Sequence, residues 1–298
     1  MLAWTPEAGP LWVHLDFEDA EAQAWIAEGS GLNDIASSAL VTPETRPRAI
    51  SRGDNLLLAL RGINLNPGAE PDDMVSVRLW TDGTRMISTR RRRLQSTLDL
   101  LEDLDAGEGP RTAPELLVAW IDRITRRMSG TVDGLEEQMD QLEESVLEDR
   151  PANVRLELAH LRKQCLTLRR YLAPQREAMN RLVSDPLGWL DELDRLRLRE
   201  INDRLVRHIE DLDALRERAA MAQEELLTQV SEAMNRRTYV FTVVATLFLP
   251  LGFFTGLMGI NVGGMPGVQD AGAFWMVVLL CVAIAAVLAG LFRFNRWL

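Results

Sequence analysis

The chain has 298 residues, of which 47% are hydrophobic and 26% are charged. Its 44 acidic residues outnumber the 33 lysines and arginines, and the resulting net charge of -11 argues against a nucleic-acid partner, because phosphate binding requires a basic surface. The only two cysteines, Cys165 and Cys281, lie in different predicted helices, which argues against a disulfide and fits a reducing compartment.

Residues 1–90 have the pattern of a mixed α/β domain. Alternating apolar residues predict a first strand over Leu11–Phe17, and helical spacing predicts a helix over Asp19–Glu28. Later strands are predicted in pairs, at Arg48–Ser51 with Asn55–Ile63 and at Val75–Trp80 with Arg85–Thr89. The domain contains no phosphate loop, nucleophile elbow or zinc-ligand spacing, so we do not expect an enzyme.

Residues 91–239 are predicted to form a helical domain. Thr112-Ala113-Pro114-Glu115 is a capping-box sequence that opens a helix running to about Asp149. A second helix is expected over Ala152–Val183, bent at Pro174. A third begins near Leu190 and meets no breaker before the apolar region, so it is expected to continue to Met258, roughly 100 Å.

A helix of this length must pack against neighbours outside one small domain. Two arrangements remain open, an antiparallel hairpin within one subunit and a bundle or coiled coil between subunits. The apolar stripe consists of Leu193, Leu196, Ile201, Leu205, Ile209, Leu212 and Leu215. The acids between them are expected to form a solvated face, with regulatory cation binding as the alternative: Asp191, Glu192, Asp194, Asp203, Glu210, Asp211 and Asp213.

Residues 240–298 are predicted to form a transmembrane domain with two spans, 240–259 and 273–292, joined by a periplasmic loop, 260–272. Each span is uncharged and about 20 residues long, which matches the roughly 30 Å hydrocarbon core of a bilayer. Arginines precede the first span, at 236 and 237, and follow the second span, at 293 and 296, whereas the loop between the spans contains none. Both chain termini should therefore face the cytoplasm.

The three histidines do not form a recognisable metal site. His14, His160 and His208 are far apart and lack a second ligand at a zinc-binding spacing. His208 with Glu210 or Asp211 is a weak candidate, and a solvated helix face is the simpler interpretation. Ligand patterns therefore do not indicate zinc.

At this point the chain resembles the CorA/ZntB family of divalent-cation transporters, along its whole length and most closely in the ZntB branch. The family signature Gly-Met-Asn corresponds here to Gly259-Ile260-Asn261, and Gly267 follows Met265-Pro266 where the magnesium type has glutamate. The residues that carry the resemblance are Asn235, Thr246–Leu251, Gly252–Asn261 and Arg296–Leu298, with support from Trp12–Asp16 and Leu168–Pro174.

The resemblance implies an α+β membrane protein that forms a homopentamer around a central pore in a bacterial inner membrane. First spans would surround the pore, long helices would form a cytoplasmic funnel, and second spans would lie outside. The resemblance implies that the transported ion is Zn²⁺ and that the direction is uptake. It implies no other cofactor, and it leaves open whether transport is coupled to protons. A channel for Mg²⁺, Co²⁺ or Ni²⁺ is the first alternative. A membrane-anchored coiled-coil scaffold or sensor that conducts nothing is an alternative of another class.

The first span carries a stripe of mostly small or polar residues at alternating steps of four and three. Its members are Thr238, Thr242, Ala245, Leu249, Gly252, Gly256 and Gly259. Such a stripe is either a close packing seam or the wall of a water-filled path. The resemblance favours the path, which would be lined by Asn235, Thr238, Phe241, Thr242, Ala245, Leu249, Gly252 and Gly256, with Phe241 and Leu249 as apolar constrictions.

Asn261 is the predicted ion-recognition residue. A carboxamide does not displace water from a small hard cation, but it accepts hydrogen bonds from that water. A ring of Asn261 carbonyl oxygens would thus recognise the hydrated ion, while Gly259 allows close backbone packing and Ile260 completes the selectivity loop. The alternative is a helix-capping asparagine. Asp270, the only acid of the loop, is expected at the pore mouth.

Overall fold

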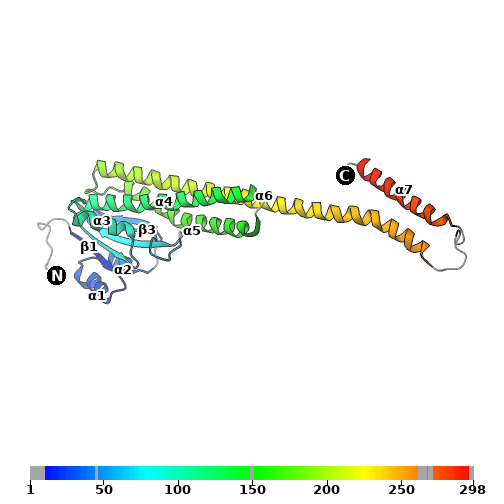
Figure 1. The fold of residues 1–298 in the computed structure, drawn as a ribbon. Coiled ribbons are helices and arrows are strands. Elements are labelled where there is room, and N and C mark those ends of the chain that lie inside the picture. The colour runs from blue at the N-terminus through cyan, green and yellow to red at the C-terminus, as the bar shows by residue number, and fades with distance from the viewer. Residues whose placement is uncertain are drawn as a thin grey trace. The chain divides into compact units, whose positions relative to one another are not determined.

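The computed structural model of the chain describes residues 11–43, 46–70, 72–147, 151–260, 267 and 271–294 (Figure 1). Contacts divide it into two compact units, Met1–Leu226 and Leu227–Leu298. The predicted domain boundaries at residues 90 and 239 stay predictions. One helix, α6, contributes to both units, and each unit is described below by itself.

The first unit contains a five-stranded sheet in the order β1-β5-β4-β3-β2. β1 (Leu11–Asp16) is parallel to β5 (Arg85–Arg90), whereas all other neighbours are antiparallel. The remaining strands are β2 (Arg48–Arg52), β3 (Asn55–Ile63) and β4 (Met74–Thr81). All five predicted strands are confirmed, each within about two residues, which is the usual uncertainty of element ends.

Three short helical segments cover one face of the sheet: α1 (Ala20–Ala24), η2 (Trp25–Gly29) and α2 (Asp34–Val41). Asp19 caps α1, because its Oδ1 accepts the amide hydrogen of Glu21 at 2.9 Å. The helix predicted over Asp19–Glu28 is present, but its second half is a π-helix. The small core on this face includes Ile26, Leu40, Leu57, Trp80 and Ile87.

The helices α4 (Ala113–Leu147) and α5 (Pro151–Ser184) cover the other face of the sheet, and α3 (Gln95–Asp105) and the first part of α6 (Glu192–Met258) pack in the same core (Figure 1). The predicted cap is present at the start of α4, although Glu115 bonds the amide of Arg111 and not that of Thr112. Thr112 Oγ1 accepts the amide hydrogen of Glu115 at 3.3 Å, and the Glu115 carboxylate accepts that of Arg111 at 2.8 Å. Pro174 lies inside α5, as expected.

α6 is a single helix of 67 residues, which confirms the predicted helix from near Leu190 to Met258. Its buried seam differs from the prediction at its start. Leu193 and Leu196 are 55% and 49% exposed, because they lie on the side of the helix opposite Leu198. The seam consists of Leu198, Ile201, Leu205, Ile209, Leu212, Leu215 and Ala219. It packs in the same core as α4 and α5, so the hairpin interpretation explains the seam up to Ala222.

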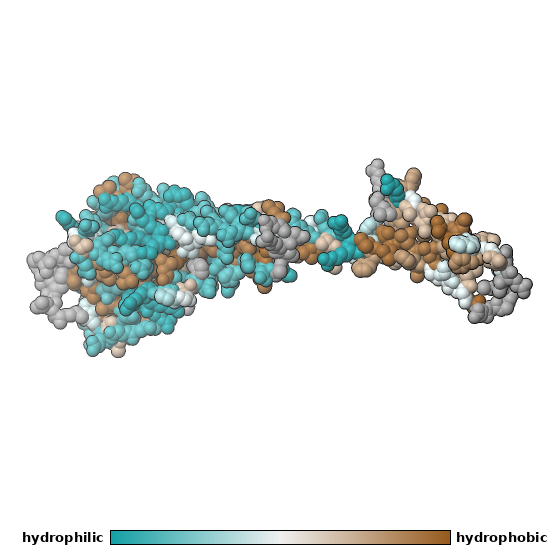
Figure 2. Space-filling view, viewed as in Figure 1, coloured by the Kyte–Doolittle hydropathy of each residue, from teal (hydrophilic) through white to brown (hydrophobic). Residues whose placement is uncertain are grey.

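The second unit contains the end of α6 and α7 (Ala273–Phe294). Both helices are long and apolar enough to cross a membrane, and neither apolar stretch is buried within the chain. Figure 2 shows the contrast in surface chemistry, with hydrophobic residues covering both helices here and hydrophilic residues dominating the first unit. The two predicted spans, 240–259 and 273–292, coincide with these helices.

Candidate functional site

The predicted pore residues from Asn235 to Gly256 all lie on the last part of α6. Their side chains are exposed within the chain, and the two predicted constrictions, Phe241 and Leu249, are 75% and 76% exposed. Gly259 ends the helix, with its amide hydrogen donated to the carbonyl oxygens of Thr255 at 3.0 Å and Gly256 at 3.1 Å. Asn261 and Asp270 lie outside the described residues. The structure thus describes the stripe but not its loop.

One side of α6 in this unit is sheltered, and it is not the side that bears the stripe. The half-buried residues of α6 are Val243, Leu247, Leu251 and Phe254, and those of α7 include Ala273, Val277, Cys281, Ile284 and Leu288. Because the described part of this unit contains only these two helices, we infer that the sheltered faces pack on each other. At 3.6 residues per turn, the sheltered face of α6 and the small-residue stripe point about 180° apart.

The stripe offers oxygen atoms but no charge between Thr238 and Gly259. Thr242 donates its hydroxyl hydrogen to the carbonyl oxygen of Thr238 at 2.9 Å. Thr255, which lies beside the stripe, donates in the same way to the carbonyl oxygen of Leu251 at 2.9 Å. These bonds satisfy each hydroxyl hydrogen inside the helix and leave the oxygen lone pairs able to accept hydrogen bonds from water. Arg236 and Arg237 precede the apolar region and lie off the stripe.

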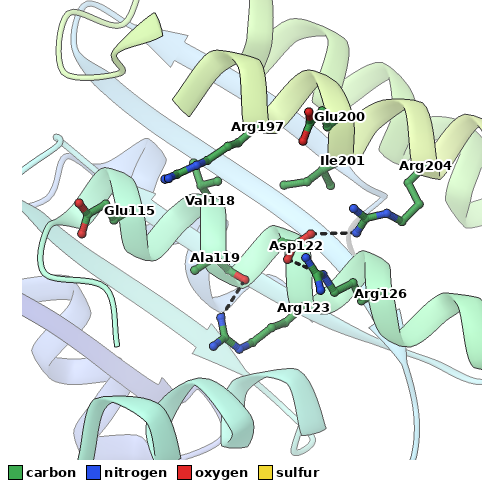
Figure 3. Close-up of a pocket in the computed structure, with 10 residues that line it drawn as sticks. All are labelled: Glu115, Val118, Ala119, Asp122, Arg123, Arg126, Arg197, Glu200, Ile201 and Arg204. Atoms are coloured by element: carbon green, nitrogen blue, oxygen red, sulfur yellow. Dashed lines mark hydrogen bonds and ion pairs between the residues drawn. The ribbon is translucent and has the colours of Figure 1, made fainter. Parts of the chain in front are cut away.

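A groove of about 360 Å³ lies between α4 and α6 in the first unit (Figure 3). Its central carboxylate, Asp122, is paired with Arg126 at 2.6 Å and with Arg204 at 2.8 Å. Four arginines and three acids line the groove together: Glu115, Asp122, Arg123, Arg126, Arg197, Glu200 and Arg204. Because two guanidinium groups compensate Asp122, this carboxylate joins the two helices and is unsuited to holding a metal ion.

The predicted solvated acidic face of α6 is correct for some residues and wrong for one. Glu192 pairs with Arg199, and Asp213 pairs with Arg169 at 2.7 Å, all at partly or fully exposed positions. Asp194 is buried, and this burial raises the pKa of its carboxyl, with Asp191 raising it further. The described residues contain no group of three or more His, Cys, Asp or Glu side chains that could hold a metal ion.

His208 is not on a solvated face, which corrects the simpler of the two expectations. It is buried between α4 and α6, with its Nε2 atom 3.3 Å from Ser129 Oγ. Burial lowers the pKa of its imidazole, and Arg204 and Arg207 oppose protonation while Asp211 and Asp133 favour it. His208 belongs to no group of three or more metal-ligating side chains among the described residues, and the weak metal site with Glu210 or Asp211 stays a prediction.

A buried aromatic cluster in the first unit had no signal in the local sequence. Ser88 Oγ lies 2.7 Å from Trp12 Nε1 and 2.8 Å from His14 Nδ1, and Trp120 of α4 contacts both rings. Burial lowers the pKa of His14 to about 4, with the Arg90 charge adding to the effect. The parallel pairing of β1 with β5 brings these residues together from distant parts of the chain.

Comparison with known proteins gives a consistent result over nearly the whole chain. Residues 7–293 match the family described as CorA-like Mg2+ transporter protein. The chain is 43% identical over 290 residues to the divalent cation transporter CmaX of Pseudomonas aeruginosa, covering 97% of this chain and 87% of that protein. It is 38% identical over 290 residues to the zinc transport protein ZntB of Yersinia enterocolitica, covering 97% and 88% respectively.

Solved structures give the same fold. The structure of full-length CmaX superimposes with a TM-score of 0.85, covering 97% of this chain and 89% of that one. The CorA magnesium transporter of Methanocaldococcus jannaschii has a TM-score of 0.84 at 19% identity, covering 96% and 91%. At that identity the second likeness supports the fold alone. It includes the soluble α/β part, the long helix and the two apolar helices.

Proposed function

Because the chain belongs to the family of CorA-like Mg2+ transporters, whose members are ion transporters and not enzymes, we propose that it carries divalent cations across a membrane. The observation that carries this proposal is the placement of the stripe. Small and hydroxyl-bearing residues run along the exposed side of α6, opposite the side that bears its half-buried residues. A helix side that faces lipid does not require small and hydroxyl-bearing residues, whereas a side that lines a water-filled path does.

Zn²⁺ is the first candidate ion. The names of the ZntB relatives support it, as does the loop Gly259-Ile260-Asn261, which has isoleucine in place of the methionine of the magnesium type. The expected direction is uptake, with coupling to protons left to experiment. Transport of Mg²⁺, Co²⁺ or Ni²⁺ is the runner-up, and the description of the family itself favours it.

The proposed assembly is a homopentamer in which five copies of α6 surround one path. A single α6 cannot enclose a path, because its stripe covers only one side of one helix. The exposure of that stripe within the chain supports the idea that neighbouring copies cover it. Mass measurement in mild detergent tests this point directly, because a monomer or dimer over a wide concentration range contradicts a shared pore.

Ion recognition is assigned to Asn261 in this proposal. Its carboxamide oxygen would accept hydrogen bonds from the first water shell of the cation, and symmetry would repeat it around the axis. The uncharged stripe below the loop is compatible with passage of a hydrated ion, because it offers acceptors for water and no ligand that would trap a metal. Gly259 caps the end of the helix, and Ile260 and Asn261 follow it in the sequence.

The proposed location is a bacterial inner membrane, with both termini in the cytoplasm. Arg236 and Arg237 precede the first apolar stretch, and Arg293 follows the second, which supports this orientation. The membrane lipid and the transported cation are then the expected partners, together with further copies of the chain.

Ion flux into liposomes is the experiment that tests the function. Purified protein would be reconstituted and assayed for Zn²⁺ and Mg²⁺ entry, with and without a pH gradient. Zn²⁺ entry above that of empty liposomes supports the leading proposal, and faster Mg²⁺ entry supports the runner-up. If neither ion enters faster, nor Co²⁺ or Ni²⁺, the scaffold or sensor alternative is favoured and transport is rejected.

A further inference from the structure

A cavity of about 590 Å³ lies in the first unit, at the edge of the sheet formed by β1 and beside the start of α3. The sheet contributes Trp12, His14 and Arg90, which lie on the face that the long helices cover. The segment entering α3 contributes Arg93, Leu94, Thr97, Leu98 and Leu101. This volume is in the range of pockets that hold small organic molecules.

The walls of the cavity divide by chemistry. Trp12, Leu98 and Leu101 form an apolar side, whereas Arg90, which is paired with Asp16, and Arg93 form the basic side. No carboxylate of the described residues lines the cavity, although the chain as a whole has a net charge of -11. His14 adds no charge near neutral pH, because burial lowers its pKa to about 4. The cavity therefore combines a basic side, of which Arg93 is the uncompensated member, with apolar surface.

Arg93 is the unpaired member of a run of four arginines. Arg91 pairs with Glu18 at 2.7 Å, Arg92 with Asp73 at 2.8 Å, and Arg90 with Asp16 at 3.4 Å. Arg93 makes no ion pair with any residue that the structure describes. A guanidinium group that lines a cavity without a carboxylate partner is free to bind an anion in two-pronged geometry.

The start of α3 adds a further donor, the hydroxyl group of Thr97. No described side chain caps this helix, and its first turn contains no acid. The partial positive charge at the N-terminus of the helix therefore lacks a compensating carboxylate in that turn, and an anion there would be favourable. Thr97 is only 1% exposed, and its Oγ1 accepts the indole hydrogen of Trp120 at 3.1 Å. Its own hydroxyl hydrogen has no acceptor among the described residues, so it is available to an oxygen atom in the cavity.

We propose that this cavity binds a small organic acid. Its anionic head would lie between Arg93, Arg90 and the first turn of α3, and its apolar body would lie against Trp12, Leu98 and Leu101. The ligand class follows from the two kinds of wall. Inorganic anions leave the apolar side in contact with water, and neutral apolar molecules leave the Arg93 guanidinium unpaired. This site is independent of the transport function.

Calorimetric titration of the full chain in lipid nanodiscs tests the site, with empty nanodiscs as the blank. Three probes are compared. 3-Phenylpropionate has both a carboxylate and an aromatic ring, inorganic phosphate is an anion without a ring, and 3-phenylpropanol has the ring but no charge. We expect 3-phenylpropionate to bind at millimolar concentration or below, and more tightly than either other probe. Equal binding of inorganic phosphate, or no binding of 3-phenylpropionate, would overturn the proposal.

Two variants locate the binding, with a matched control between them. Arg93→Gln should raise the Kd for 3-phenylpropionate about tenfold, the loss expected for one charge-assisted hydrogen bond. Arg92→Gln, in the same run but paired with Asp73 and absent from the cavity wall, should leave the Kd unchanged. Leu98→Trp should abolish binding by filling the cavity, with an unchanged unfolding midpoint as the check on folding. Equal weakening by both arginine variants would mean diffuse charge attraction and would reject the site.

Discussion

The indole Nε1 of Trp189 donates a hydrogen bond of 2.6 Å to the backbone carbonyl oxygen of Asp54. The Asp54 carboxylate in turn accepts the amide hydrogen of Gly188 at 2.9 Å. Trp189 belongs to the connection between α5 and α6, whereas Asp54 belongs to the turn between β2 and β3. The beginning of the long helix is therefore fastened to the sheet, and the strength of this attachment can be measured.

Gly83→Ala should destabilise the first unit more than an ordinary turn substitution does. Gly83 has a φ of +87°, and a Cβ atom there would lie 2.2 Å from Cγ of Trp189. Strain and overlap together should lower the free energy of unfolding by about 2–4 kcal/mol, as measured by denaturant unfolding of the full chain in detergent.

Gly53→Ala is the matched control for this experiment. Gly53 has a φ of +59° in the neighbouring turn, but a Cβ atom added there would have no other atom within 4 Å. It should cost about 1 kcal/mol from backbone strain alone. Equal losses for the two glycine variants would show that the contact with Trp189 has no energetic consequence.

The stability of the first unit should fall in mild acid because of His14. Its folded pKa of about 4 lies below the ordinary value of 6.5, so between these values the unfolded chain binds the proton and the folded chain does not. Stability is therefore lost as pH falls through this window, by about 2 kcal/mol between pH 7 and pH 5. His14→Gln should remove this part of the pH dependence of unfolding, whereas the exposed His160→Gln should not. An unchanged pH profile in His14→Gln would contradict the assignment.

Thiol accessibility should distinguish the two sides of α6 in the membrane. In a background without Cys165 and Cys281, Ala245→Cys and Gly252→Cys should react with a charged thiol reagent and lose Zn²⁺ flux. Val243→Cys and Leu251→Cys, on the side sheltered by α7, should react slowly and keep their flux. The reverse pattern of reactivity would place the path on the side of Val243 and Leu251 and would contradict the proposed pore lining.

Asp270 is expected to act through long-range attraction of cations. A ring of exposed carboxylates at the pore mouth is screened over about 8 Å at physiological ionic strength, so it should concentrate cations without binding them tightly. Asp270→Asn should therefore lower flux at low salt and have little effect at high salt. A large loss that persists at high ionic strength would instead indicate a direct ligand.

Local sequence signals predicted the elements of the fold well. The capping box at Thr112 located the start of α4, and the absence of any breaker after Leu190 predicted the whole of α6. The length and lack of charge of the two apolar runs predicted both long apolar helices. Each of these features depends on neighbours within a few residues, which is why sequence alone was sufficient.

Features that depend on distant partners were not predictable in the same way. His14 meets Ser88 and Trp120 only because β1 pairs with β5 and α4 covers the sheet. His208 and Asp194 looked like members of a solvated face, since charged neighbours surround them in sequence, yet both are buried by the packing of the helices. The assignment of Leu193 and Leu196 to the seam failed because spacings of three to five residues allow more than one helix face.

Zn²⁺ entry into liposomes that contain equal amounts of wild-type protein, Asn261→Ala or Val243→Ala is the most direct test of cation transport through this path. Wild-type protein and Val243→Ala, altered on the side sheltered by α7, should admit Zn²⁺ well above empty liposomes. Asn261→Ala should fold and assemble normally but lose most of this flux, because methyl groups replace the acceptors for the hydrated ion. Wild-type rates of Zn²⁺ and Mg²⁺ entry in Asn261→Ala would contradict the proposed recognition loop, and no entry with the wild-type protein would contradict transport itself.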